Sequence, residues 1–151
     1  MCTNKFEMYF SSISENESFA RVAVAAFLTK LDPTLEEISD IKTAVSEAVT
    51  NAIIHGYEGK TDRQVYLSCE IENQTIRITV KDEGIGIEDV EKAREPLYTT
   101  KPDLDRSGMG FVFMEVFMDK LEVVSNLGQG TKIVMEKEIG KACYDEDLTG
   151  E

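Results

Sequence analysis

Two neighbouring runs of alternating apolar residues constrain the fold of this chain most, because the second run leads directly into an acidic, glycine-rich loop. Residues 65–71 and 76–80 each place apolar side chains at every second position, which predicts two strands with one buried face. Asp82 continues the phase of the second run, so its carboxylate is expected on the buried face, where it requires hydrogen-bond donors. Gly84 and Gly86 then let the backbone approach closely, since glycine carries no Cβ. From these residues alone, a turn that caps Asp82 and a ligand site are equally good interpretations.

The other predicted elements follow in a definite order. A strand over 5–11 precedes a helix that starts at a capping box in 14–17 and stops at Asp32-Pro33. A second capping box, in 34–37, starts a helix that is expected to reach His55 and end at Gly56. The two strands are followed by a short helical piece at 88–95, a helix over 110–120, and a hairpin of strands 121–126 and 131–138. This order predicts a two-layer α/β sandwich, with helices on one face of a mixed, mainly antiparallel sheet.

Length and charge bound the class of protein. The 151 residues fit one domain, expected over 1–141, followed by an acidic tail at 142–151 that is expected to be disordered. The net charge of −13 argues against a nucleic-acid partner and favours a basic protein partner. No apolar run reaches the ~18 residues that a membrane span needs. Three widely spaced cysteines without a C-x-x-C pair, and no signal peptide, make the cytoplasm the expected compartment.

The helix expected to end at Gly56 carries a row of polar residues beside its apolar stripe. Glu47, Asn51 and His55 are spaced by four residues, so they share one edge of the helix. Glu47 offers a carboxylate, and Asn51 offers a neutral oxygen that suits a hard cation such as Mg²⁺. For these residues alone, a solvated helix edge is the more common explanation.

A third candidate site lies where the helix over 110–120 begins. Ser107-Gly108-Met109-Gly110 leads into it after a long connection, and free N–H groups at a helix N-terminus bind anions. Arg106 would add positive charge beside these glycines, and Lys101, five residues earlier, would add another. The G-x-x-x-x-G-K-[ST] pattern of a P-loop is absent from the sequence.

In this order and spacing the motifs resemble the nucleotide-binding boxes of the GHKL ATPase/kinase superfamily. Residues 47–56 (EAVTNAIIHG) resemble its N box, 82–87 (DEGIGI) its G1 box, and 108–110 (GMG) its G2 box. Residues 96–101 resemble the segment leading into the ATP lid, and 130–131 occupy the place of a further glycine turn. The resemblance implies a Bergerat-type fold with a lid, and a site for ATP or ADP with Mg²⁺.

The resemblance also implies a role for individual residues. Asp82 would accept a hydrogen bond from the adenine amino group, Asn51 would coordinate Mg²⁺, and Glu47 would take the proton from an attacking serine. Arg106 would meet the phosphates, and Thr131 would lie near the adenine. The other residues implied to bind the nucleotide belong to the two glycine loops and the lid: Gly84, Gly86, Thr99, Lys101, Ser107, Gly108, Met109 and Gly110.

Three stretches, 17–27, 31–34 and 47–58, narrow the resemblance to the anti-sigma serine kinases of sporulating bacteria, of the sigma F type. That family implies a homodimer with two protein partners. One is a sigma factor of RNA polymerase, which it sequesters, and the other is an anti-anti-sigma protein, which it phosphorylates on serine. Arg21 is implied to lie on the surface that meets both partners. We expect it to be exposed, with Phe19, Val22 and Ala23 facing the core.

Two alternatives stay open. A stress-response anti-sigma kinase would share every nucleotide motif, and a non-catalytic module would bind ATP only to set its affinity for a partner. Glu47 distinguishes a kinase from the non-catalytic module, since a protein that only binds ATP needs no catalytic base. An autophosphorylating histidine kinase is disfavoured, because the single histidine, His55, lies inside the N-box-like segment and no separate dimerisation helix is predicted.

Overall fold

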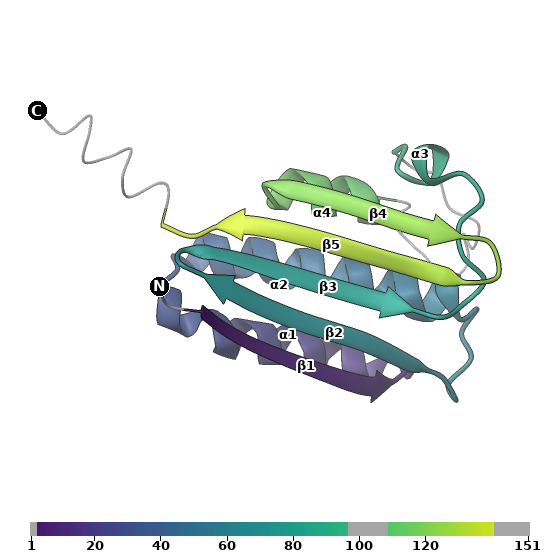
Figure 1. Ribbon diagram of the computed structural model, residues 1–151, viewed down its shortest axis with the longest axis horizontal. Helices are drawn as coiled ribbons and strands as arrows, with labels where there is room; N and C mark the ends of the chain where they lie inside the picture. Colours follow the sequence, from purple (N-terminus) through teal and green to yellow (C-terminus); the bar gives the residue numbers. More distant parts are fainter. Residues whose placement is uncertain (1–2, 97–108, 141–151) are drawn as a thin grey trace, which may run out of the picture.

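A five-stranded sheet that carries helices on one face makes up the computed structural model, which describes residues 3–96 and 109–140 (Figure 1). The strands are β1 (Thr3–Ser11), β2 (Gln64–Glu72), β3 (Thr75–Asp82), β4 (Lys120–Asn126) and β5 (Gly130–Glu138). The helices are α1 (Glu15–Leu28), α2 (Leu35–Thr50), α3 (Val90–Ala93) and α4 (Gly110–Phe117), with a 3₁₀ turn at Thr29–Leu31 and a π-helical turn at Asn51–Gly56. The predicted α/β sandwich is confirmed. Most of the predicted lid and the predicted tail lie outside the described residues.

The strands follow the order β1-β2-β3-β5-β4, and each of the four described pairings is antiparallel. The sheet that was expected to be mixed is therefore antiparallel throughout the part of the chain that the structure describes. The predicted strand over 5–11 is an edge strand. β5 pairs with both β3 and β4. In the register of the β3–β5 pair, Thr131 at the start of β5 lies directly opposite Asp82 at the end of β3.

Local hydrogen bonds explain where the two long helices begin. Glu37 N donates to Thr34 Oγ1 at 3.1 Å and Thr34 N donates to Glu37 Oε1 at 2.9 Å, so the second predicted capping box is confirmed. The first one is wrong, because Ser14 has helical backbone angles and makes no side-chain cap. Asn16 Nδ2 instead donates to Ser11 O at 2.8 Å and joins the end of β1 to the start of α1.

The buried face of α1 differs from the prediction. Ala20, Val24 and Leu28 are buried, whereas Phe19 and Val22 are 54% and 61% exposed. The three buried residues are spaced by four, so they form a narrow stripe along α1 that packs against α2. Because Ala20 is small, the two helices can approach closely there. The two larger side chains consequently point to solvent.

Two helix ends also differ. The helix predicted over 110–120 ends at Phe117, and Lys120 already begins β4. The second helix does reach Gly56, as expected, but its last turn is π-helical. Within the described ranges, no helix combines the length and apolarity needed to cross a bilayer.

Candidate nucleotide site

Asp82 ends β3 with its side chain turned toward the helices, as its strand phase predicted, and it is 3% exposed. Gly84 N donates to Asp82 Oδ1 at 2.9 Å. Burial raises the pKa of the Asp82 carboxyl to about 6, and hydrogen bonds from the backbone N–H groups of Gly84 and Thr131 offset part of that rise. A carboxylate has about four acceptor positions, so these two donors leave it able to accept from a ligand.

Bare backbone surrounds the Asp82 carboxyl on one side. A Cβ on Gly56 would lie 2.6 Å from Asp82 Cγ, so the carboxyl rests directly against the last residue of the π-helical turn. Ile85 N donates to Gly56 O at 2.9 Å, and any Cβ on Gly84 would overlap that same carbonyl oxygen. The N-box-like helix and the G1-like loop are therefore joined through their glycines.

The second half of the loop is attached to the β4–β5 hairpin. Gly86 has a φ of +76°, and a Cβ there would overlap Asn126 O. Gly128 N donates to Ile85 O at 2.7 Å. Ile87 N donates to Ser125 Oγ at 2.7 Å, and Ser125 Oγ lies 2.8 Å from Thr131 Oγ1. Thr131, which is 4% exposed, is thus linked through Ser125 to the loop that follows Asp82.

Glu47 and the first residue of α4 lie close together. A Cβ on Gly110 would be 3.1 Å from Glu47 Oε2, so the missing side chain leaves space for the carboxylate. Asn51, one turn later, is the first residue of the π-helical turn. Turns of this kind are frequent at functional sites. The structure thus brings Glu47 and Gly110 together at one place, and Asp82, Gly84 and Thr131 at another.

Three residues that the sequence did not single out for the site hold it in shape. Tyr57 Oη accepts a hydrogen bond from Glu83 N at 2.8 Å and donates to Gln64 O at 2.5 Å, which anchors the start of the loop. Ser125 joins the loop to β5, as described above. Gly56 was predicted as a helix end and as the last residue of the N-box-like segment, without a role of its own. An aromatic residue one position after that glycine was a weak signal for Tyr57, and Ser125 had none.

Of the remaining predicted residues, the structure describes Met109 and Arg21. Thr99, Lys101, Arg106, Ser107 and Gly108 lie outside the described residues, whereas Met109 caps α4. Arg21 lies on α1, which packs on the opposite side of α2 from α4 (Figure 1). Its side chain is 37% exposed and pairs with Glu17 at 3.5 Å, so it is less exposed than expected.

Two features limit what the site can hold. Among the described residues, no group of three or more His, Cys, Asp or Glu side chains could bind a metal. A Mg²⁺ ion would therefore need ligand oxygens from a nucleotide as well as from Asn51, which is how Mg²⁺ is commonly bound. A hollow of about 550 Å³ beside Tyr57 and Gly84 is lined by neither Asn51 nor Glu47, so it is not where the predicted contacts converge.

Comparison with known proteins shows the family of the chain. The family model of the histidine kinase-like ATPase domain matches residues 10–137. The anti-sigma F factor of Oceanobacillus iheyensis is 55% identical over 92% of this chain and 95% of its own length. The anti-sigma F factor of Clostridium novyi is 61% identical over 92% and 97%, and that of Clostridium perfringens is 61% identical over 90% and 97%.

Solved structures support the fold. The RsbU and RsbW domains of a Mycobacterium tuberculosis protein superpose with a TM-score of 0.65 at 17% identity, over 90% of this chain and 32% of that one. A blue-light activated histidine kinase of Erythrobacter litoralis superposes with a TM-score of 0.57 at 24% identity, over 75% and 34%. The chain thus belongs to the histidine kinase-like ATPase family and, within it, to the anti-sigma F factors.

Proposed function

We propose that this protein is a Mg-ATP-dependent serine kinase that sequesters a sigma factor of the sigma F type and phosphorylates an anti-anti-sigma protein. The observation that carries the catalytic part is the position of Glu47, whose carboxylate faces Gly110 at the start of α4. The relatives named anti-sigma F factor support the sigma-binding part. Their high identity also favours this branch over a stress-response kinase.

Asp82 is proposed to recognise adenine. Its carboxylate is buried, and two backbone N–H groups fill only part of its acceptor capacity. An exocyclic amino group is a donor that can reach a carboxylate without adding charge. Gly84 and Thr131 hold the carboxylate in place for that contact.

Asn51 and Glu47 are proposed to act at the phosphate end. Mg-ATP, when bound, would supply the γ-phosphoryl group and leave as ADP, and the metal would neutralise charge on the phosphates. Asn51 would hold the metal through its side-chain oxygen. Glu47 accepts the proton of the substrate serine hydroxyl, and Gly110 lets that hydroxyl approach because it carries no side chain.

Partner binding is proposed to use a different surface. Arg21 on α1 has a partly exposed side chain on the same helix as the exposed Phe19 and Val22, and arginine is enriched among interface hot spots. The net charge of −13 favours a basic partner surface. We propose that the chain works as a homodimer in the cytoplasm, with one sigma factor and one anti-anti-sigma protein competing for this surface.

The test of the kinase assignment replaces Glu47 by alanine. We expect the Glu47→Ala variant to bind Mg-ATP like the parent but to phosphorylate the anti-anti-sigma protein more slowly by a factor on the order of 10²–10⁴. The matched control is Glu122→Ala, which removes an exposed carboxylate from β4. The readout is phosphoserine in the partner, measured by mass spectrometry. Equal rates in Glu47→Ala and parent would favour a non-catalytic, ATP-gated binding module instead.

A further inference from the structure

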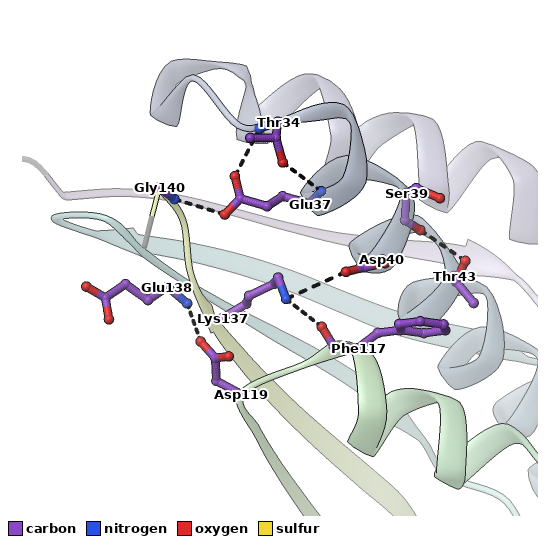
Figure 2. Close-up of polar contacts among 10 residues, drawn as sticks. All are labelled: Thr34, Glu37, Ser39, Asp40, Thr43, Phe117, Asp119, Lys137, Glu138 and Gly140. Atoms are coloured by element: carbon purple, nitrogen blue, oxygen red, sulfur yellow. Dashed lines mark hydrogen bonds and ion pairs between the residues drawn. The ribbon is translucent and has the colours of Figure 1, made fainter. Parts of the chain in front are cut away.

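Lys137 occupies a position on β5 where the strand pattern calls for an apolar residue. Ile133 and Met135 precede it in the same phase and are buried, and the Lys137 side chain is only 14% exposed. Its Nζ donates to Phe117 O, at the end of α4, at 2.8 Å, and lies 3.9 Å from Asp40 Oδ2 on α2 (Figure 2). A poorly solvated ammonium group is costly unless such partners compensate it.

The two helices that Lys137 joins have matching contacts at both ends. Asp40 and Glu47 are seven residues apart on α2, and Gly110 and Phe117 are seven residues apart on α4. Glu47 meets Gly110 at one end, and Lys137 links Asp40 to Phe117 at the other. Seven residues span roughly 10.5 Å in an α-helix, so α4 runs antiparallel to α2 with the two contacts in register.

The strand that carries Lys137 is itself held on both sides (Figure 2). Gly140 N donates to Glu37 Oε2 at 2.9 Å, which attaches the end of β5 to the first turn of α2. Glu138 N donates to Asp119 Oδ2 at 2.8 Å, which attaches β5 to the segment following α4. The backbone around Lys137 is therefore hydrogen-bonded both to α2 and to the segment that follows α4.

We propose that Lys137 is a positioning residue that sets the register of α4 along α2 and thereby keeps Gly110 beside Glu47. The carbonyl groups at a helix C-terminus carry partial negative charge, which an ammonium group stabilises. Losing that contact lets α4 shift along α2, and a shift of about 1 Å is enough to impair a reaction that depends on placement. The proposed consequence for catalysis rests on the kinase function, whereas the register itself does not.

The experiment compares Lys137→Met, Lys137→Arg and Asp40→Asn with the parent, and uses Lys132→Met, on the exposed face of the same strand, as the control. In Lys137→Met we expect hydrogen exchange of the α4 amides to accelerate at least tenfold, while the amides of β2 and β3 keep parental rates. We also expect the kcat of serine phosphorylation to fall roughly tenfold with the KM for ATP changed less than twofold, because the Asp82 side of the site is untouched. Lys137→Arg should restore most of both effects, and Asp40→Asn should show a smaller loss.

Parental α4 exchange in Lys137→Met would overturn the proposal, and so would equal acceleration in α4, β2 and β3, since the latter indicates general destabilisation. Should Lys137→Met not fold, the proposal then rests on Asp40→Asn, and parental α4 exchange in that variant would overturn it. A parent protein that transfers no phosphate would refute the proposed kinase function, while the exchange measurements would still decide the role of Lys137.

Discussion

At the residue scale, the account depends on a carboxyl group that the fold keeps away from water. Asp82 is buried between the bare backbone of Gly56 and the start of β5, and burial raises its pKa to about 6. The protonated form that burial favours cannot offer a full charge to a donor. Nucleotide binding through Asp82 should therefore depend on pH near that value.

The first prediction concerns this pH dependence. If the adenine amino group donates to ionised Asp82, the affinity for Mg-ATP should rise by about tenfold between pH 5 and pH 7.5, as the pKa of about 6 is passed. Asp82→Asn should bind ATP far more weakly, because the amide lacks the charge that roughly doubles the strength of such a bond. Its residual binding should not change over the same range. Calorimetric titrations at the two pH values, with Glu83→Gln as the control, measure both effects.

The same group gives a prediction for stability. The folded-state pKa of Asp82 lies above its ordinary value of 3.8, so between these values the folded protein binds more protons than the unfolded chain does. The free energy of unfolding contributed by this group therefore decreases as pH rises from about 4 to 6, by up to about 3 kcal/mol. Relative to Asp82→Asn, the nucleotide-free parent should lose stability over that range in urea denaturation. A difference that stays constant with pH would contradict the buried position of the carboxyl.

At the scale of elements, the loop after β3 depends on the contact between two turns. Gly86 and Gly128 have nearly equal φ values, +76° and +77°, but a Cβ on Gly86 would overlap Asn126 O, whereas nothing lies within 4 Å of a Cβ on Gly128. Substituting each glycine in turn therefore distinguishes the cost of backbone strain from the cost of steric overlap.

Gly86→Ala is expected to destabilise the protein by about 3 kcal/mol or more, since it combines strain with displacement of the β4–β5 turn. Gly128→Ala should cost only about 1 kcal/mol, the strain alone. Chemical denaturation gives both values. Nucleotide affinity should fall in the first variant and stay parental in the second. Equal costs would mean that the loop and the hairpin are not in tight contact.

Another prediction belongs to α1. Replacing Arg21 by glutamate should weaken sigma-factor binding by more than ~2 kcal/mol, because it reverses the charge of an arginine, a residue type enriched among interface hot spots. ATP affinity should be unchanged, since α1 is separated from the nucleotide site by α2. Lys30→Glu, at the far end of the same helix region, is the control. Joint loss of ATP and sigma binding in Arg21→Glu would indicate a folding defect rather than an interface role.

The elements also show which features the sequence could predict. The period-two runs of β2 and β3, the Thr34 capping box and the phase of Asp82 were all predictable, because each depends on residues close together in the chain. The insertion of β5 between β3 and β4, the approach of Gly56 to Asp82 and the partners of Lys137 were not, because they depend on contacts between distant segments. The prediction that Phe19 faces the core failed for the same reason, because the packing of α1 against α2 decides which side of α1 is buried.

At the scale of the whole molecule, the sheet and α2 divide the proposed functions. The nucleotide side comprises the loop after β3, the end of α2 and the start of α4, while α1 and its Arg21 lie on the other side of α2 (Figure 1). Within residues 3–96 and 109–140, α2 contacts both α1 and α4, so it is the element through which a nucleotide can influence partner binding. The central claim is thus that nucleotide occupancy at Asp82 controls sigma-factor binding.

The most direct test is a titration of the sigma F-type factor into the parent protein and into Asp82→Asn. Each protein is titrated without nucleotide and with Mg-ATP at a concentration that saturates the parent. The account predicts that Mg-ATP strengthens sigma binding by the parent at least tenfold. In Asp82→Asn, affinity at the same ATP concentration should stay at the nucleotide-free level of the parent. Equal sigma affinity of the parent with and without Mg-ATP would contradict the account.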